Sequence, residues 1–107
     1  MITEFTRYHI PSGREAAFEQ AYTEAQKYLA ASPYCRSYAL LRCVEEPGHY
    51  VLRIDWTSID EHLKGFRRSA DFPKFFAAVK PFVDHIQEMQ HYEPTGIASS
   101  SATGGAS

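Results

Sequence analysis

The chain has 107 residues, a net charge of −2 and two cysteines. Its length fits a single domain, and its eleven Lys and Arg residues are too few and too scattered for a nucleic-acid-binding surface. The longest apolar run, Phe75–Val79, is too short to cross a membrane. With no secretory apolar segment and no CxxC motif, the sequence predicts a cytoplasmic protein with reduced thiols.

The first part of the chain predicts a strand, a helix and a second strand. Residues 2–10 are rich in β-branched and aromatic side chains and end at a Pro-Ser-Gly turn. Ser12 and Glu15 have the spacing of a capping box, which starts a helix, and apolar residues recur behind them at helical intervals as far as Leu29. Residues 34–44 then read as a long strand.

A turn at Glu46–His49 predicts an antiparallel return into a third strand, residues 50–56, which ends in Trp56. Ser58 and Glu61 form a second capping-box pair, so a helix should begin directly after that tryptophan.

This helix should break before Pro73, because proline suits the first turn of a new helix. Residues 72–83 carry a dense apolar stripe at helical spacing, and residues 85–93 read as a last strand in which Ile86 and Tyr92 share one face. The domain is therefore predicted to span residues 1–94. The Ser- and Gly-rich tail, residues 95–107, has little to bury and is predicted to be disordered.

The resulting order is β-α-β-β-α-β, which predicts an α+β, ferredoxin-like fold with helices on one face of the sheet. The third strand carries bulky apolar residues on both faces, Val51 on one and Leu52 and Ile54 on the other. A second apolar face is seldom left in water, so we expect a homodimer that presses two sheets together. Arg53 and Asp55, on the face opposite Trp56, are candidates for paired charges in that interface.

The strand-to-helix corner brings Trp56 and His62 to one end of the fold. The indole N–H of Trp56 could stabilise negative charge on a substrate oxygen, or Trp56 could be a core residue bonded to a backbone carbonyl. His62 lies near the end of the first helical turn, where the helix dipole disfavours imidazolium. A neutral ring there could accept a proton at pH near 7; the alternative is an edge-packed histidine.

Several aromatic residues could line a pocket for a flat apolar molecule, or simply pack the core: Tyr8, Phe66, Phe72, Phe75, Phe76 and Phe82. The other four histidines are expected at the surface or in an interface: His9, His49, His85 and His91. No pair of them has a spacing typical of metal ligands, so no metal site is predicted.

The run from Leu52 to His62, the Ser-Ala-Asp-Phe stretch at 69–72 and the closing His91-Tyr92-Glu93 strand resemble the antibiotic biosynthesis monooxygenase family of dimeric α/β-barrel proteins. The resemblance covers roughly residues 2–94. It implies a ferredoxin-like protomer, a homodimeric barrel and a pocket between sheet and helices. Some members oxidise aromatic polyketides with molecular oxygen and neither metal nor flavin, others oxidise quinols, and others bind or degrade haem.

Three positions depart from the patterns of these types. Leu52 stands where the oxygenase type has an asparagine. Phe66 stands where the haem-degrading type has its iron-ligating histidine, and Thr6 falls where that type has an asparagine.

The expected function is a cofactor-independent monooxygenase acting on an aromatic or quinol-like small molecule. Trp56 and His62 are the expected catalytic residues, and the expected pocket residues are Thr6, Tyr8, Leu52, Phe66, Phe72 and Phe76. The alternative is a non-catalytic homodimeric module that binds a small hydrophobic ligand or haem. A haem-degrading enzyme with a non-standard ligand is a third reading.

Overall fold

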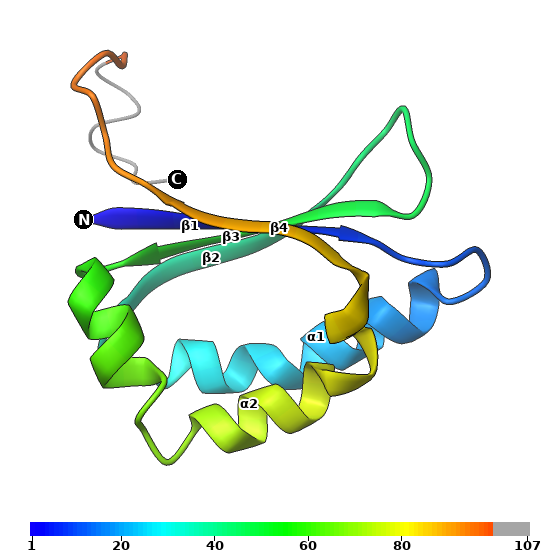
Figure 1. Cartoon of the computed structure of the whole chain (residues 1–107), viewed down its shortest axis with the longest axis horizontal. Helices are drawn as coiled ribbons and strands as arrows, with labels where there is room; N and C mark the ends of the chain where they lie inside the picture. Colours follow the sequence, from blue (N-terminus) through cyan, green and yellow to red (C-terminus); the bar gives the residue numbers. More distant parts are fainter. Residues whose placement is uncertain (100–107) are drawn as a thin grey trace.

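The computed structural model describes residues 1–99, which form a four-stranded antiparallel sheet with all helices against one face (Figure 1). The α+β, ferredoxin-like fold is confirmed. The elements in chain order are β1 (Ile2–His9), α1 (Glu15–Ala30), β2 (Cys35–Arg42), β3 (His49–Trp56), the π-helix η1 (Glu61–Phe66), α2 (Phe72–Val79), the 3-10 helix η2 (Lys80–His85) and β4 (Ile86–Tyr92).

None of the helices within residues 1–99 is long and apolar enough to span a membrane. Of the tail predicted to be disordered, residues 100–107 lie outside the described residues.

The strand order is β2-β3-β1-β4, so β1 lies at the centre with β3 and β4 as its neighbours. Thr6 of β1 pairs with Leu52 of β3 and with Met89 of β4. Leu52, Ile54 and Trp56 are buried on the face that the helices cover. The opposite face, which no helix covers, is called the open face below (Figure 1).

Strand β4 contains a bulge. Arg7 pairs with Glu88 whereas Tyr8 pairs with Ile86, so Gln87 is an extra residue in the ladder. The prediction that Ile86 and Tyr92 share a face is therefore wrong. Ile86 faces the helices, and the Tyr92 ring packs edge-on against Phe5 on the open face, with ring centroids 5.4 Å apart.

The two predicted capping boxes have different outcomes. No side chain caps the start of α1, and the Glu15 carboxylate accepts a hydrogen bond from the Gly13 N–H instead, so the prediction for Ser12 is wrong. The Ser58 hydroxyl accepts a hydrogen bond from the Glu61 N–H at 3.0 Å, which confirms one half of the second box. In the other half, the Glu61 carboxylate accepts from the Ser58 hydroxyl at 3.3 Å and not from the Ser58 N–H. The break before Pro73 is confirmed as well, because α2 begins at Phe72.

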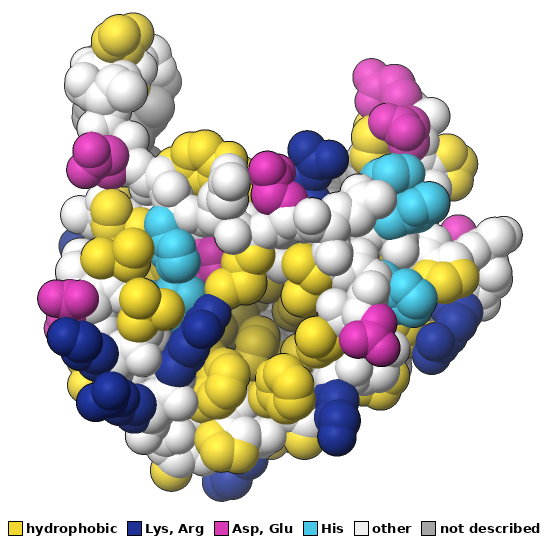
Figure 2. Space-filling view, viewed as in Figure 1, with side chains coloured by type: hydrophobic (Ala, Val, Ile, Leu, Met, Phe, Trp, Pro, Cys, Tyr) yellow, Lys and Arg dark blue, Asp and Glu magenta, His cyan; other side chains and the backbone are white. Residues whose placement is uncertain are grey.

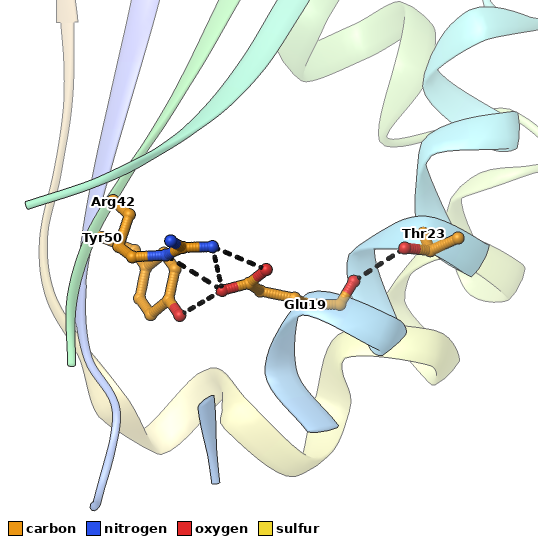
Figure 3. Close-up of polar contacts among 4 residues, drawn as sticks. All are labelled: Glu19, Thr23, Arg42 and Tyr50. Atoms are coloured by element: carbon orange, nitrogen blue, oxygen red, sulfur yellow. Dashed lines mark hydrogen bonds and ion pairs between the residues drawn. The ribbon is translucent and has the colours of Figure 1, made fainter. Parts of the chain in front are cut away.

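A polar contact ties α1 to the sheet at the end remote from Trp56 (Figure 3). The Glu19 carboxylate accepts hydrogen bonds from the Tyr50 hydroxyl at 2.6 Å and from Arg42 Nη2 at 3.1 Å. The Tyr50 hydrogen bond, with the Arg42 guanidinium, lowers the pKa of Glu19. The Thr23 hydroxyl donates to the Glu19 carbonyl one turn along the helix. This contact fixes α1 over β2 and β3.

The open face carries both apolar and charged side chains. Leu41 and Tyr92 are 50% and 46% exposed there. The Asp55 carboxylate is buried on this face, accepting 2.6 Å hydrogen bonds from the Thr3 and Ser37 hydroxyls, and Arg53 Nε lies 3.8 Å from it. The β2–β3 hairpin and the segment after β4 rise on either side of the open face (Figure 1).

Candidate functional site

A cavity of about 250 Å³ lies between the helix-covered face of the sheet and the helices η1, α2 and η2. Figure 2 shows the hollow bordered mainly by hydrophobic side chains. The six predicted pocket residues all line it: Thr6, Tyr8, Leu52, Phe66, Phe72 and Phe76. The aromatic residues of the helices therefore leave a space against the sheet instead of filling it.

Trp56 and His62 form the floor of one end of the cavity. Their rings are stacked, with centroids 4.2 Å apart and planes 7° apart, and both side chains are buried. The Trp56 N–H donates to Glu4 Oε1 at 2.9 Å. The indole N–H is thus bonded to a side chain of β1. It is neither bonded to a backbone carbonyl nor left free for a bound ligand.

The π-helical turn of η1 places His62 against the indole. The Arg67 N–H donates to the His62 carbonyl at 3.1 Å, five residues back, which is the wide turn that defines a π-helix and that is frequent at functional sites. Gly65 in the same turn packs against the Tyr34 ring, and a Cβ at this position would lie 2.7 Å from a ring carbon. The glycine therefore allows η1 to approach this end of the sheet.

Glu4 is the centre of the polar end of the cavity. Its side chain is buried, and it lines the cavity beside Trp56. Oε1 accepts the Trp56 N–H, and Oε2 accepts the Thr6 hydroxyl at 2.8 Å. His62 Nε2 lies 3.4 Å from Oε1. A carboxylate can accept about four hydrogen bonds, so Glu4 keeps lone pairs for a further partner.

A second histidine completes this end of the site. His62 Nδ1 lies 2.8 Å from His91 Nε2, and His91 is the β4 partner of Glu4 across the sheet. His91 is only partly buried, so the cluster of Glu4, Trp56, His62 and His91 runs from the cavity toward the protein surface. We call this set the polar cluster.

Burial lowers the pKa of His62 to about 3, and the positive charge of Arg67 and the neighbouring His91 act in the same direction. The Glu4 carboxylate favours the charged ring, but burial outweighs it because the imidazole is almost completely removed from solvent. His62 is therefore neutral at physiological pH.

Farther along the cavity, the hydroxyls of Tyr8 and Tyr22 are hydrogen-bonded to each other at 2.5 Å. Burial raises the pKa of Tyr8 to about 12 and raises that of Tyr22 as well. Both hydroxyls therefore stay protonated near neutral pH. They can orient a polar group of a guest but cannot remove a proton from it.

Atoms of Glu4, His62 and His91 lie within 4.8 Å of one another, and carboxylate and imidazole are common metal-binding groups. In this structure His62 contacts its two partners directly, through Nε2 at 3.4 Å from Glu4 Oε1 and through Nδ1 at 2.8 Å from His91 Nε2. The arrangement fits a hydrogen-bonded cluster better than a coordination shell.

Sequence reasoning overlooked two residues of this site: Glu4 and His91. Arg67, the residue directly after η1, is exposed and borders the cavity. His91 was expected at the surface or in an interface. Glu4 had no signal of its own, because only the strand register reveals that it faces the indole.

Residues 1–78 match the family model of the antibiotic biosynthesis monooxygenases. This chain belongs to that family. The part of the chain that matches the antibiotic biosynthesis monooxygenase model contains Glu4, Trp56 and His62. His91 lies outside the matched residues.

Known antibiotic biosynthesis monooxygenase structures agree with the fold. A Bordetella bronchiseptica protein, described as a candidate antibiotic biosynthesis monooxygenase, is 31% identical, with a TM-score of 0.74 over 88% of this chain and 96% of that one. SnoaB of Streptomyces nogalater, a cofactor-independent oxygenase crystallised as a mutant, is 19% identical with a TM-score of 0.72 over 88% and 92%, which shows a shared fold. YczJ of Bacillus subtilis, an uncharacterized protein, is 27% identical over 87% of this chain and 98% of its own length.

Proposed function

We propose that this protein is a cofactor-independent monooxygenase that oxidises a compact aromatic or quinol-like molecule with molecular oxygen. The observation that carries the proposal is an apolar cavity closed at one end by buried polar groups, Glu4, Trp56 and His62. Membership of the antibiotic biosynthesis monooxygenase family supports the reaction class.

The chemistry needs little from the protein. A hydroquinone, phenol or anthrone that has lost a proton can reduce oxygen by one electron, and the two radicals then recombine. The site must desolvate the substrate, accept its proton and stabilise the anion. The apolar walls supply the first function, and the polar cluster supplies the other two. Trp56 and His62 contribute to them as the N–H donor and the neutral imidazole of that cluster.

The cavity volume limits the substrate. At about 250 Å³ it lies just below the range of about 300–1,000 Å³ typical of pockets for drug-sized ligands. We therefore expect a substrate of at most a few fused rings. The aromatic side chains on the helical wall, Phe66, Phe72 and Phe76, suit a planar guest.

We further propose that the protein acts as a homodimer formed through the open face. Leu41 and Tyr92 leave apolar surface exposed there, and Arg53 Nε is buried without a hydrogen-bond partner in the single chain. A second copy would cover the apolar side chains.

One observation favours the alternative of a non-catalytic binding module. The Trp56 N–H and His62 Nδ1 already have partners inside the protein, so neither is free to meet a guest without rearrangement. For this alternative we expect a small apolar ligand. A cavity of about 250 Å³ is small for haem.

Oxygen uptake separates the two functions. Purified protein is mixed with 1,8-dihydroxyanthrone or with substituted hydroquinones, and the rates of wild type, Trp56→Phe and His62→Ala are compared. His85→Ala is a matched control, because His85 lies on η2 and does not line the cavity. We expect loss of activity in the first two variants only. Equal rates in all four proteins would reject both roles and favour the binding module.

A further inference from the structure

The polar cluster must contain the atom that receives the substrate proton. Trp56 offers only an N–H, which is a donor. The hydroxyls of Tyr8 and Tyr22 are bonded to each other. Two groups basic enough to take up a proton remain at this end of the cavity, the imidazole of His62 and the carboxylate of Glu4.

The surroundings of His62 decide its tautomer. A neutral imidazole carries one N–H and one lone pair. Because Nε2 lies 3.4 Å from a Glu4 carboxylate oxygen, the N–H belongs on Nε2, where it faces negative charge. Nδ1 then holds the lone pair, and His91 Nε2–H donates to it at 2.8 Å. In this state His62 has no free lone pair toward the cavity.

Glu4 is arranged differently. Each of its oxygens accepts one well-formed hydrogen bond, Oε1 from Trp56 and Oε2 from Thr6. Oε1 also faces His62 Nε2 at 3.4 Å, so Oε2 is the oxygen that keeps a second acceptor site. The two donors come from β3 and β1, so the carboxylate is held in place by the rigid sheet and not by a mobile loop. It is the one carboxylate among the residues that line the cavity.

We propose that Glu4 is the catalytic base of the reaction, and that His62 and His91 are positioning residues that hold the carboxylate in its orientation. This inference rests on the proposed function. It also narrows the substrate to a weak acid, namely a phenol, a hydroquinone or an aromatic CH₂ compound, whose acidic proton can reach the sheet end of the cavity.

The steps balance for an aromatic CH₂ substrate. Glu4 takes one C–H proton, and the carbanion gives one electron to O₂; the radical pair forms a C–O bond. The resulting peroxide anion takes back the proton from Glu4 as a hydroperoxide. Glu4 then removes the second C–H proton while the O–O bond breaks, which leaves a C=O group and hydroxide. Hydroxide takes the proton from Glu4 to become water, so the CH₂ group and O₂ give C=O and H₂O.

Anaerobic binding of 1,8-dihydroxyanthrone tests the base without the oxygen chemistry. The anion of this probe absorbs at longer wavelength than the neutral form, and binding is followed separately through the fluorescence of Trp56, the single tryptophan. At pH 7 we expect wild type to bind the anion and Glu4→Gln to bind the neutral form with similar affinity. Glu24→Gln, a carboxylate change on the exposed side of α1, should behave as wild type.

Oxygen uptake should fall at least tenfold in Glu4→Gln. Glu4→Asp, which keeps a carboxylate but shortens it, should retain ionisation of the bound probe and part of the rate; it also serves if the glutamine variant folds poorly. His91→Ala should lose rate and regain part of it with added imidazole, a response that a purely structural role would not give.

Equal ionisation of the probe by wild type and Glu4→Gln would overturn the assignment of the base. An activity that is abolished by EDTA and restored by a divalent cation would overturn it too, since the cluster would then act through a metal. Ionisation by wild type without any oxygen uptake would support Glu4 as a base and contradict the monooxygenase function. The two proposals therefore fail in distinguishable ways.

Discussion

The imidazole of His62 lies flat on the indole of Trp56, with 4.2 Å between the ring centroids and 7° between the planes. The contact buries both rings in one stack beneath the cavity, and it leaves the edges of both rings directed at other members of the polar cluster. One edge of the indole meets Glu4, and one edge of the imidazole meets His91.

Burial of a neutral His62 makes stability depend on pH. The pKa of His62 is lowered to about 3 in the folded protein, so the unfolded chain binds a proton below about pH 6.5 that the folded protein does not bind. Stability should therefore fall as pH drops from about 6.5 to about 3, by at most about 1.4 kcal/mol per pH unit. The groups around the ring are Glu4, Arg67 and His91.

Urea unfolding at intervals between pH 7.5 and pH 4 measures this dependence. His62→Phe keeps a ring on the indole but cannot titrate, so its stability should change less with pH than that of wild type over this range. An identical pH slope in the two proteins would contradict the buried neutral histidine.

The hydrogen bond between Trp56 and Glu4 should be measurable as a coupling energy. Hydrogen bonds to charged groups contribute about 1.5–3 kcal/mol, so a double-mutant cycle with Trp56→Phe and Glu4→Gln should give a coupling below that range, since glutamine still offers an acceptor. Pairing Trp56→Phe with Glu4→Leu, which offers none, should give the larger value. Chemical denaturation supplies the four free energies of each cycle.

A matched cycle uses Thr6→Val in place of Trp56→Phe, because the Thr6 hydroxyl donates to the other oxygen of the same carboxylate. A coupling near zero for Trp56 would mean that the indole N–H does not hold Glu4 in solution.

Gly65 should resist a substitution that usually stabilises helices. Replacing a helical glycine with alanine ordinarily gains about 0.5–1 kcal/mol. Here the new methyl group would lie 2.7 Å from a carbon of the Tyr34 ring, so the ring or the π-helical turn must move. We expect Gly65→Ala to lower stability by about 1 kcal/mol or more, a cost typical of overpacking, and to weaken ligand binding because η1 carries His62.

Thermal melts of Gly65→Ala in the wild-type and Tyr34→Ala backgrounds check the cause. The penalty should shrink when the ring is absent. A rise in melting temperature for Gly65→Ala in the wild-type background would show that the close packing against Tyr34 does not exist.

The open face should control the oligomeric state. Leu41→Lys places a charge on the apolar part of this face and should convert a dimer into a monomer at low micromolar concentration. Size-exclusion chromatography with light scattering measures the mass. Ile59→Lys is a suitable control, because Ile59 is similarly exposed but lies at the start of the helical segment that precedes η1. A wild-type protein that is already monomeric would refute the proposed interface.

The local patterns of the chain predicted its helices and strands well, because the start of a helix or strand depends mainly on residues that are neighbours in sequence. Pro73 marked the start of α2, and the Ser58–Glu61 pair marked the helix after Trp56. The polar cluster could not be found in this way. Along β1, Glu4 and its neighbour Phe5 point to opposite faces of the sheet, and this pattern equally suits a Glu4 carboxylate that faces solvent. Only the pairing of β1 with β3 and β4 reveals that the Glu4 face is the buried one.

The four aromatic pocket residues followed from the aromatic pattern of the chain, whereas Thr6 and Leu52 came from the family resemblance. That resemblance also supplied the long-range arrangement that periodicity lacks. His91 was missed for a specific physical reason. If side chains alternate strictly from Ile86 onward, position 91 falls on the open face of the sheet. The local sequence contains no signal for the bulge at Gln87, which returns His91 to the helix-covered face.

That bulge bears on how this chain should be aligned with its relatives. Ile86 and His91 face the same side of β4 although an odd number of positions separates them, because Gln87 takes up one position without advancing the ladder. A relative with an unbroken β4 must carry its counterpart of His91 one position nearer the beginning of that strand. An ungapped alignment would therefore match His91 with a residue that points away from the cavity.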